Sequence, residues 1–482
     1  MTHLHELLKH LQQSYFYEGP DPVIRDIVYD SRHAGTDTLF VAVRGYRTDG
    51  HNFISDARQK GAAACIVEEA VESSIPQIVV NDSRRALAEL SHVFFHSQPL
   101  PFPLLGITGT NGKTTMTHLL YQLAESCGKN PALVGTLGAK SANYYEDEDR
   151  TTPESRDLAL LFRRFEQENI SAVFMEVSSH AIALQRVHGL YFDAAVFTNL
   201  TRDHLDFHSD MEEYFQTKAR IFRQLRPGAL SIVNIDDNYG KRLYDMISTA
   251  KLSYSLKNSR ADVHFLELSA DIRGIHGILN TPAGRFRIKA PLLGAFNAEN
   301  ISGSIAAWLH LFPDEKEVAD NFPFRSVDGR MEMIPGSRGT AVIDYAHTPD
   351  AMEKALSTIV RLTGRKRIIT LFGCGGDRDH DKRPMMGKVA DKYSDIIILT
   401  NDNPRSEDPL QIAENILTGI ENKEKTEICL DRKKALLKAY GYSEKGDIIM
   451  ILGKGAEKYM EINGKRIPFN DKEIVKELEK YK

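Results

Sequence analysis

Glycine, threonine and lysine residues cluster in the stretch Gly106-Ile107-Thr108-Gly109-Thr110-Asn111-Gly112-Lys113-Thr114-Thr115. The apolar run 104–107 predicts a short buried strand before it, and the apolar spacing over 116–127 predicts a helix that stops at Gly128. Glycines between a strand and a helix let the backbone approach a phosphate, while the helix N-terminus and Lys113 supply positive charge. The stretch therefore predicts a nucleotide phosphate loop in which Thr114 or Thr115 can hold Mg²⁺. The alternative is a plain glycine turn with a solvated lysine, which the strand and helix context disfavours.

Two further strand-like runs, at 172–175 and 194–197, lead into polar loops that contain Glu176 and His204. In open α/β sheets ligands bind beyond the carboxyl ends of the strands, so we expect both side chains to converge on the phosphate loop. Carboxylate oxygen is a natural ligand of Mg²⁺, whereas imidazole is a less usual one. The residues alone thus favour Glu176 as a metal ligand and leave His204 open between a ligand and an ordinary structural histidine.

The last third of the chain predicts a second binding face. Apolar runs at 368–372, 396–399 and 448–452 each lead into a distinctive loop, namely Gly373 to Arg378, Asp402 to Arg405 and Gly453 to Glu457. Arg378 and Arg405 can clamp carboxylates through two-pronged hydrogen bonds, and Glu457 can receive an ammonium group. Surface arginines on glycine turns are the alternative.

The order of the elements predicts an α/β fold with several domains. The length of 482 residues suggests about three domains. Strand-like runs at 38–43, 62–67 and 77–80 precede a proline-rich stretch at 97–103, which reads as a domain boundary because alternate prolines fit neither a central strand nor a helix. After it, strands alternate with helices as in a doubly wound sheet.

Composition and charge argue against several classes of protein. The net charge of −5 and the pI near 6.4 argue against a nucleic-acid-binding face. Four scattered cysteines, none in a C-x-x-C pair, indicate neither a disulfide framework nor a zinc site and fit a reducing cytoplasm. The N-terminus lacks the pattern of a signal peptide, and no apolar run approaches the roughly 18 residues of a membrane span. We expect a cytoplasmic protein that is neither secreted nor inserted in a membrane.

With these motifs the chain resembles the Mur ligases along essentially its whole length, and most closely the members that add meso-diaminopimelate to a UDP-muramoyl dipeptide. The other matching motifs are Asp30-Ser31-Arg32, Thr151-Thr152-Pro153, Glu176 to His180, Asn199 to Asp206, Tyr214 to Lys218, Gly294 to Asn300 and Asp344 to Asp350. The resemblance implies three domains: a UDP-binding domain at 1–101, a P-loop ATPase domain with a doubly wound sheet at 102–331, and a Rossmann-like domain for the amino acid at 332–482.

The resemblance also implies a reaction of peptidoglycan precursor synthesis. ATP phosphorylates the side-chain carboxylate of the D-glutamate in UDP-N-acetylmuramoyl-L-alanyl-D-glutamate, and the amine of meso-diaminopimelate attacks the acyl phosphate. Collapse of the tetrahedral intermediate releases phosphate and leaves an amide. Lys113 and Mg²⁺ would neutralise the transferred phosphoryl group. We expect a monomer whose partners are these small molecules.

Residue roles follow from the same resemblance. Thr114, Glu176 and His204 would be metal ligands, joined by Lys218, which sequence alone reads as a solvated helix lysine but which the family carries as a carbamate. Lys113, Lys218, Glu176 and His204 would form the catalytic group. The positions matched to ATP are Gly109, Thr110, Asn111, Gly112, Lys113, Thr114, Thr115, Asn297, Asn300, Arg330, Asp344 and His347. Those matched to the UDP-sugar peptide are Ser31, Gly50, His51, Thr151, Thr152, Ser178 and Arg186. Those matched to the acceptor are Arg378, Asp402, Asn403, Pro404, Arg405, Gly453 and Glu457.

Four positions depart from the family pattern. Ala456 replaces a usual His, Ser326 a usual Pro, Leu184 a usual Gln and Arg150 a usual Asn. They leave open a paralogue with another amino-acid acceptor. A folylpolyglutamate synthetase-like ligase would lack the segment around Asp30-Ser31-Arg32 and the 402–405 loop, and a non-catalytic protein would be expected to have lost Lys113, Glu176 or Lys218.

Arg405 is the residue most expected to select the acceptor. Meso-diaminopimelate has one more carboxylate than lysine, and the guanidinium group offers it a planar fork on a loop stiffened by Pro404. Lysine would leave that guanidinium unpaired, and sites of this kind reject such an analogue by roughly 10⁴-fold to 10⁵-fold.

Overall fold

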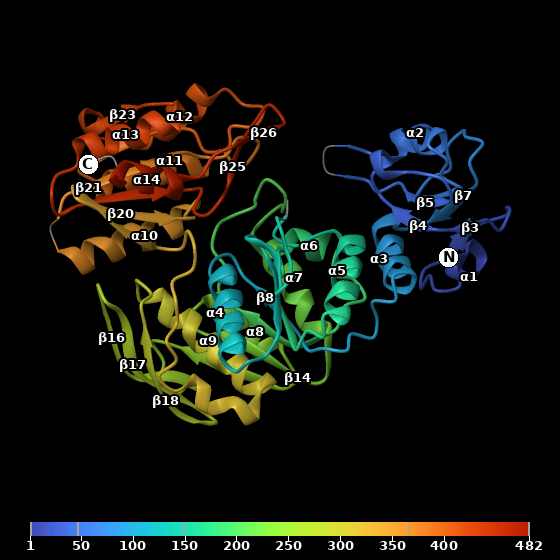
Figure 1. Cartoon of the computed structure of the whole chain (residues 1–482), viewed down its shortest axis with the longest axis horizontal. Coiled ribbons are helices and arrows are strands. Elements are labelled where there is room, and N and C mark those ends of the chain that lie inside the picture. The colour runs from blue at the N-terminus through green and yellow to red at the C-terminus, as the bar shows by residue number, and fades with distance from the viewer. Residues whose placement is uncertain (1, 46–47, 148–149, 365, 481–482) are drawn as a thin grey trace. The chain divides into compact units, whose positions relative to one another are not determined.

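A computed structural model describes residues 2–45, 48–147, 150–364 and 366–480 (Figure 1). The described chain forms two compact units. The first consists of the residues up to Thr108 with Gly128–Ala195 and Thr217–Ala229, and the second of Gly109–Cys127, Val196–Gln216 and the residues from Leu230 onward. Each unit combines helices with mainly parallel strands, which confirms the predicted α/β class. The chain passes between the units within β13 (Phe192–Phe197), α7 (Met211–Ala219) and β14 (Leu225–Asn234).

The first unit begins with a five-stranded sheet in the order β2-β7-β6-β5-β4, parallel except for the edge strand β2. Alternate residues of its central strands enter different buried clusters, since Leu39 packs with α1 and α3 whereas Phe40 packs with α2. The strands predicted at 38–43, 62–67 and 77–80 are β5, β6 and β7. The elements of this part are β1 (Thr2–His3), α1 (Leu4–Leu8), β2 (Tyr15–Phe16), β3 (Val23–Ile24), β4 (Asp26–Val28), η1 (Ser31–His33), β5 (Thr38–Val41), η2 (Gly50–Phe53), α2 (Ile54–Gln59), β6 (Ala64–Val67), β7 (Gln77–Val80) and α3 (Ser83–Phe94).

The rest of the first unit carries strands in the order β11-β10-β9-β12-β8, of which β9, β12 and β8 are parallel. Between α3 and β8, the proline-rich stretch 95–103 contains no helix or strand. β8 and β12 confirm the strands predicted at 104–107 and 172–175, and Glu176 at the end of β12 lies opposite Ile107 of β8. The elements are β8 (Leu104–Thr108), β9 (Pro131–Gly135), β10 (Gly138–Lys140), β11 (Tyr145–Glu146), α5 (Ser155–Gln167), β12 (Ala172–Glu176), α6 (Ser179–Ala183) and η3 (Arg220–Arg223).

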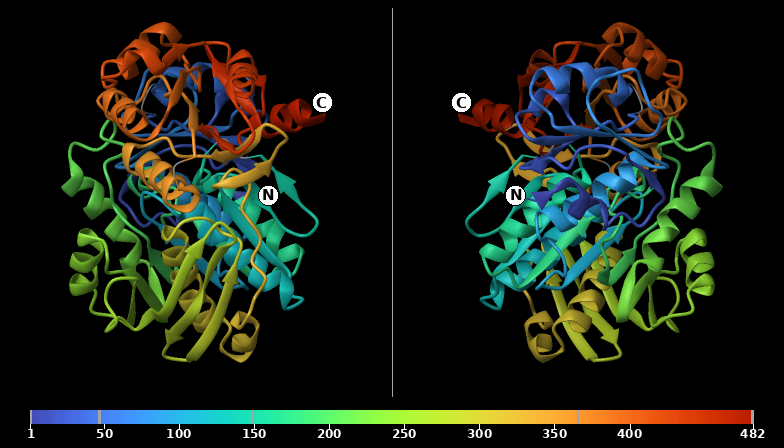
Figure 2. Two further views of the ribbon diagram at one scale, coloured as in Figure 1. Left: turned by 90° about the vertical axis from the view of Figure 1, so that its left-hand side faces the viewer. Right: turned by 90° about the vertical axis from the view of Figure 1, so that its right-hand side faces the viewer.

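The second unit contains the helix that follows the phosphate loop and the strand order β14-β15-β16-β17-β18. β16, β17 and β18 form an antiparallel meander whose strands run side by side at the lower edge of Figure 2, left. The apolar helix α9 packs against α4, with Ile301, Ile305 and Trp308 buried. The elements are α4 (Lys113–Ser126), α8 (Asn238–Met246), β15 (Lys251–Ser255), β16 (Val263–Asp271), β17 (Gly274–Thr281), β18 (Gly284–Ala290), α9 (Phe296–Leu311) and η4 (Pro313–Ala319).

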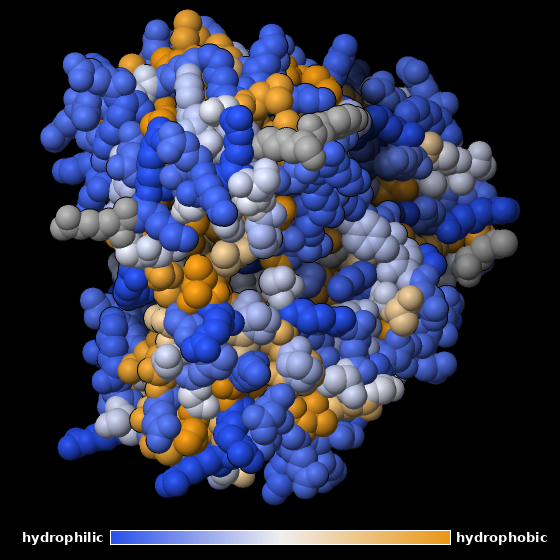
Figure 3. Space-filling model, turned by 60° about the vertical axis from the view of Figure 1, so that its left-hand side comes forward, coloured by the Kyte–Doolittle hydropathy of each residue, from blue (hydrophilic) through white to orange (hydrophobic). Residues whose placement is uncertain are grey.

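The surface is dominated by polar residues. Hydrophilic residues cover most of the face in Figure 3, in keeping with a chain of which 26% is charged. Among the described helices, none is both long enough and apolar enough to cross a membrane.

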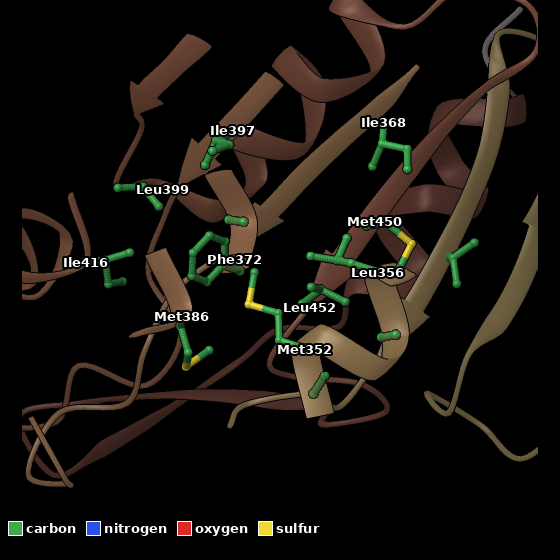
Figure 4. Close-up of a cluster of buried hydrophobic side chains, with 14 of the residues drawn as sticks. Met352, Leu356, Ile368, Phe372, Met386, Ile397, Leu399, Ile416, Met450 and Leu452 are labelled. Carbon is green, nitrogen blue, oxygen red and sulfur yellow. The ribbon is translucent and has the colours of Figure 1, made fainter. Parts of the chain in front are cut away.

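The C-terminal part of the second unit is a six-stranded sheet in the order β19-β20-β24-β21-β22-β23, parallel except for β19. Side chains of α10, α11 and α12 meet one face of this sheet (Figure 4), and α13 and α14 cover the other. The strands predicted at 368–372, 396–399 and 448–452 are β21, β22 and β24. The elements are β19 (Glu332–Pro335), β20 (Gly339–Asp344), α10 (Pro349–Thr363), β21 (Ile368–Phe372), α11 (Lys382–Tyr393), β22 (Ile396–Leu399), α12 (Pro409–Leu417), η5 (Lys423–Lys425), β23 (Thr426–Ile428), α13 (Arg432–Tyr442), β24 (Asp447–Leu452), β25 (Tyr459–Ile462), β26 (Lys465–Pro468) and α14 (Asp471–Lys480).

A buried ion pair holds the ends of two strands from which loops of the predicted second binding face start. Arg432 at the start of α13 and Asp471 at the start of α14 have side chains with no exposed surface, and the nitrogen Nη2 lies 2.7 Å from Oδ2. The same guanidinium donates to the carbonyl oxygens of Asn401 and Leu452, at 3.1 and 3.0 Å. These two carbonyls lie just beyond β22 and at the end of β24. The pair therefore ties two helices to two of the three loops.

We predict that Arg432→Met lowers the free energy of unfolding by about 3–5 kcal/mol, because it leaves the buried Asp471 carboxylate without its partner. Urea unfolding followed by circular dichroism measures the effect. Lys434→Met on the same helix is the matched control, since its ion pair with Asp431 is exposed and should contribute less than about 1 kcal/mol. Equal losses in the two variants would show that the buried pair does not hold the loops.

Candidate active site

The phosphate loop is tightly folded between β8 and α4. Gly109 and Gly112 have φ of 144° and 92°, a region that glycine enters without strain. A Cβ atom at Gly109 would lie 1.9 Å from Thr198 Oγ1, and one at Gly112 would lie 2.4 Å from Asn300 Oδ1. Both glycines are thus required by conformation and by close approach. The helix begins at Lys113, three residues before the predicted 116, so Lys113 and Thr114 belong to its first turn.

Asn199 holds the loop in this shape. Its carbonyl oxygen accepts from the backbone N–H of Thr110 at 2.9 Å, and its side-chain Oδ1 accepts from the N–H of Asn111 at 3.0 Å. The hydroxyl of Thr198 donates to the carbonyl of Asn111 at 2.6 Å. The strand predicted at 194–197 is β13. The residues directly after it, Thr198 and Asn199, therefore contact the phosphate loop.

Two cationic side chains lie at the first turn of α4. Lys113 Nζ donates to the carbonyl oxygens of Gly109 and Thr110, each at 2.9 Å, so the ammonium group is folded over the loop. Arg330 Nη2 donates to the hydroxyl of Thr114 at 2.7 Å, and its guanidinium group lies 4.4 Å from the ring centre of Tyr345. Positive charge is concentrated where a helix N-terminus already favours anions.

Other residues matched to ATP support this arrangement. Asn300 touches Gly112 and donates to Asn297 Oδ1 at 2.8 Å. Asp344 accepts from the backbone N–H of Met331 at 2.7 Å, which fixes the residue after Arg330, and burial raises the pKa of this carboxyl. The His347 ring lies 2.9 Å through Nδ1 from the Tyr345 carbonyl oxygen, and desolvation followed by the charge of Lys382 lowers its pKa.

His204 lies in the segment that follows β13, and its ring lies next to the buried carboxylate of Asp203. Its Nε2 lies 3.4 Å from Asp203 Oδ2, and its backbone has a positive φ of 56°, uncommon outside glycine. Burial of Asp203 alone would raise the pKa of its carboxyl, but the charges of His204 and Lys382 bring that pKa below its ordinary value. This partner orients the imidazole ring.

Glu176 is 1% exposed and is held by Thr136 in the first unit. Its Oε1 accepts from the Thr136 backbone N–H at 2.9 Å, and its Oε2 accepts from the Thr136 hydroxyl at 3.1 Å. That hydroxyl lies 3.1 Å from the hydroxyl of Thr151. The metal ligand predicted at the end of β12 is thus linked to a residue matched to the UDP-sugar peptide. Its convergence with His204 and the phosphate loop, which belong to the second unit, stays a prediction.

Lys218 is buried, with 1% of its surface exposed. The interpretation of this residue as a solvated helix lysine is therefore wrong, since solvent does not reach it. Fully buried lysines are rare, so the burial of Lys218 sets it apart from an ordinary surface lysine. Within the described ranges, no three side chains of His, Cys, Asp or Glu gather closely enough to hold a metal ion by themselves.

Three residues matched to the UDP-sugar peptide form one hydrogen-bonded group in the first unit. The Thr152 hydroxyl accepts from the Ser178 backbone N–H at 3.1 Å and donates to the Glu176 carbonyl oxygen at 2.9 Å. Arg186 Nη1 donates to the Thr152 carbonyl oxygen at 3.0 Å. Thr152, Ser178 and Arg186 therefore lie together beside Glu176.

Sequence reasoning missed Glu154 and Arg84, which complete this group. The Glu154 carboxylate is surrounded by guanidinium nitrogens of Arg84, Arg150 and Arg186, at 3.5, 3.3 and 3.0 Å. Arg84 Nη1 and Arg186 Nε, the nitrogens that face Glu154, are both buried. Burial, together with the nearby arginines, lowers the pKa of Arg186 to about 10. Arg150 and Glu154 also line a cavity of about 980 Å³, whose lining contains both arginines and carboxylates.

The remaining residues matched to the UDP-sugar peptide lie in two short turns near α2. Ser31 begins η1, and its carbonyl oxygen accepts from Lys60 Nζ at 2.8 Å. Gly50 begins η2, where a Cβ atom would lie 2.6 Å from the backbone nitrogen of Val43. His51 is fixed from both ring nitrogens, by Asp49 Oδ1 at 2.6 Å and by the backbone N–H of Glu68 at 3.0 Å.

The three loops predicted to form a second binding face meet at the carboxyl ends of β21, β22 and β24. The Gly376 N–H donates to the Asn403 carbonyl oxygen at 2.9 Å, and Asn403 Nδ2 donates to Glu457 Oε2 at 3.0 Å. A Cβ atom at Gly453 would lie 2.4 Å from Asp402 Oδ2. Asp402, Asn403 and Pro404 are buried, whereas Arg378 is exposed and donates to the Asp377 carbonyl oxygen at 3.2 Å.

Two cations of this predicted binding face, Arg405 and Lys454, are already paired with carboxylates. Arg405 Nε donates to Glu461 Oε2 at 3.0 Å, and Lys454 Nζ donates to Glu457 Oε2 at 2.8 Å and to Asn403 Oδ1 at 3.1 Å. The expectation that lysine would leave the Arg405 guanidinium unpaired is therefore wrong, because Glu461 pairs with it. The sequence carried no signal for Glu461, which lies 56 residues further along the chain.

The four departures from the family pattern lie in different surroundings. Ala456 is half-buried, and its backbone nitrogen would lie 2.2 Å from a Cβ atom at Gly329. Arg150 joins the cluster around Glu154. Leu184 caps the end of α6, and Ser326 is exposed.

Three family models match consecutive parts of the chain. "Mur ligase family, catalytic domain" matches residues 23–95, "Mur ligase middle domain" matches residues 107–308, and "Mur ligase, glutamate ligase domain" matches residues 329–455. Together they show three parts in the order expected, while the boundaries at 101 and 331 stay predictions.

Relatives match over nearly full length. A UDP-N-acetylmuramoyl-L-alanyl-D-glutamate--2,6-diaminopimelate ligase of Aquifex aeolicus is 41% identical over 94% of this chain and 93% of its own. The enzyme of that name from Geobacillus thermodenitrificans is 38% identical over 98% of both chains. A solved structure of that name has a TM-score of 0.63 and 31% identity, covering 95% of each chain. Folylpolyglutamate synthase of Mycobacterium tuberculosis shares the fold with a TM-score of 0.63, but at 15% identity over 76% of this chain and 92% of its own.

We predict that Glu154→Gln lowers the free energy of unfolding by about 3 kcal/mol, because three guanidinium groups then face one another without a carboxylate. The loss should be larger at low salt than at high salt, since salt screens repulsion between partly exposed charges. Urea unfolding at two salt concentrations measures both effects. The control is Glu166→Gln, which removes an exposed pair with Arg163; a loss no larger than that of this control would contradict the role given to Glu154.

Proposed function

The chain belongs to the Mur ligase family, and from this we propose that it is an ATP-dependent, ADP-forming ligase that adds meso-diaminopimelate to UDP-N-acetylmuramoyl-L-alanyl-D-glutamate. In this reaction a carboxylate oxygen of the D-glutamate side chain takes the γ-phosphoryl group of ATP, and ADP leaves. The acceptor amine then attacks the acyl carbon, loses a proton, and expels phosphate. This step forms one amide bond of a peptidoglycan precursor.

One observation carries the proposal from the structure itself. The turn Gly329–Arg330 touches both halves of the reaction, because Arg330 donates to Thr114 of the phosphate loop at 2.7 Å while Gly329 lies against the backbone of Gly455 and Ala456 in an acceptor loop. A single turn thus connects the nucleotide side with the amino-acid side. That arrangement suits a ligase which must transfer a phosphoryl group and then receive an amine nearby.

The residues of the phosphate loop have complementary roles in the proposal. Lys113 and Arg330 stabilise negative charge that develops on the transferred phosphoryl group. Asn297, Asn300, Asp344 and His347 hold the loop and the Arg330 turn in place. Because these groups are positioned before ATP binds, little reorganisation is needed in the transition state.

The donor set of the proposed metal site fits Mg²⁺. Thr114, Glu176, His204 and a carbamate on Lys218 would hold the ion, and Mg²⁺ neutralises phosphate charge when it is bound. Mg²⁺ keeps several waters and binds substrate phosphates, so it does not need a closed cage of three carboxylates.

The charge of each proposed substrate is complementary to the side chains proposed to bind it. The UDP-sugar peptide, which is anionic, would meet the cluster of Arg84, Arg150 and Arg186, with the turns of Ser31, Gly50 and His51 holding its nucleotide end. The amino-acid acceptor would meet Arg405 through its distal carboxylate and Glu457 through the adjoining ammonium group. Placement in the cytoplasm, a monomeric state, and the absence of nucleic-acid and membrane partners belong to the same proposal.

We predict a preference for meso-diaminopimelate over L-lysine of roughly 10²-fold to 10³-fold in kcat/KM. This is smaller than for a site with an unpaired cation, because Glu461 neutralises Arg405 when no acceptor carboxylate is bound. Phosphate release with ATP, the UDP-dipeptide and each amino acid measures the preference. Arg405→Ala should remove most of it. Equal wild-type rates with both amino acids would refute the acceptor while leaving the ligase activity standing.

Lys218→Ala should lose ligation by at least about 100-fold, and a short carboxylic acid such as formate should restore part of it by supplying the missing anion. The comparison is Lys241→Ala, an exposed lysine of α8, which should keep wild-type turnover and should not respond to the acid. Full activity of Lys218→Ala without added acid would rule out the carbamate.

A further inference from the structure

Arg405 is held by the hairpin formed by β25 and β26. Its backbone N–H donates to the Glu461 carbonyl oxygen at 3.1 Å, and its carbonyl oxygen accepts from the Asn463 N–H at 2.8 Å. The residue has a φ of 53°, a conformation that a long side chain adopts only when its surroundings impose it. The hairpin therefore sets the backbone direction from which the guanidinium group projects.

The side chain of Arg405 is fixed as well. Nε donates to Glu461 Oε2 at 3.0 Å and Nη1 donates to the Gly376 carbonyl oxygen at 2.8 Å. Within the part of the chain that the structure describes, Nη2 has no hydrogen-bond partner, so it is the corner of the fork left for a ligand. The Arg405 side chain is 18% exposed, so most of it is enclosed and part of it meets solvent.

Glu461 connects this arginine to the rest of the acceptor face. Its backbone N–H donates to Asn403 Oδ1 at 2.9 Å, and the same oxygen accepts from Lys454 Nζ at 3.1 Å. Asn403 Nδ2 in turn donates to Glu457 Oε2. Glu461 therefore links the residue proposed for the acceptor carboxylate with the residue proposed for its ammonium group.

We propose that Glu461 is a positioning residue that sets the affinity for the acceptor by holding the Arg405 guanidinium in the orientation that receives the acceptor's distal carboxylate. The proposal rests on the function given above. A free arginine loses rotamer freedom on binding, and a guanidinium already fixed by Glu461 and Gly376 has lost it in advance. Glu461 acts through Arg405 and contacts no reacting atom.

Two substitutions separate positioning from charge. Glu461→Gln keeps an oxygen that accepts from Arg405 Nε but removes the negative charge, whereas Glu461→Ala removes both. We expect Glu461→Ala to raise the KM for meso-diaminopimelate about tenfold, with kcat and the KM values for ATP and the UDP-dipeptide unchanged. Glu461→Gln should stay within about threefold of the wild type. Combined with Arg405→Ala, Glu461→Ala should add no further loss, because the arginine it positions is gone.

The control is Glu427→Ala in the same C-terminal part, where the carboxylate pairs with Lys438 and Tyr442; it should leave every KM unchanged. If both Glu461 variants lower the KM for meso-diaminopimelate, the main effect of Glu461 is to neutralise Arg405. If Glu461→Ala leaves that KM unchanged, Gly376 and the backbone suffice to position the arginine. Either result overturns the proposal. Additive losses in the double variant would also overturn it. If the wild type itself fails to use meso-diaminopimelate, the proposed function has failed instead, so the two failures are distinguishable.

Discussion

A buried charge must have a partner, and this constraint shapes the loops on which the function depends. Removing a charged side chain from water costs several kcal/mol unless an opposite charge and hydrogen bonds replace the solvent. Arg432 meets this condition by binding Asp471 and two strand-end carbonyls, and Lys454 meets it through Glu457 and Asn403. Because Asp471 and Asn403 come from another helix or loop, satisfying the charge also ties these segments together. Side chains that are already held by such contacts lose less freedom when a ligand binds.

The two regions proposed to bind the substrates differ in their balance of charge. Around Glu154, three guanidinium groups face a single carboxylate. On the acceptor face, Arg405 is balanced by Glu461 and Lys454 by Glu457. An excess of positive charge suits an anionic sugar peptide, whereas a balanced face suits a zwitterionic amino acid. The distribution of partners therefore agrees with the two substrates proposed for the enzyme.

Parallel strands explain why residues far apart in the chain act together. The carboxyl ends of β21, β22 and β24 share one edge of their sheet, so the loops after them must meet there. In the first unit, the register of β8 and β12 sets Glu176 opposite Ile107, two residues before the phosphate loop begins. The Gly329–Arg330 turn then links the phosphate loop to an acceptor loop. Proximity thus follows from strand order rather than from the length of chain between the residues.

The sequence by itself determined the strands that lead into the predicted sites and the loops that follow them. Apolar runs gave β8, β12, β21, β22 and β24 to within a residue or two, because strand and helix periods are local properties of the chain. The start of α4 was missed by three residues, since its first turn is polar and carries no apolar period. The phosphate loop and the three acceptor loops were recognisable because glycines and charged residues follow these runs directly.

Only the tertiary structure decided which side chains become partners. The burial of Lys218, the carboxylate of Glu154 among three arginines, and the pairing of Arg405 with Glu461 depend on segments brought together by packing. A local pattern contains no information on such distant contacts, and a charged residue reads the same in sequence whether it is solvated or enclosed. The sequence thus indicated which kinds of functional group are present. The fold determined the partners, the orientation and the solvent exposure of these side chains.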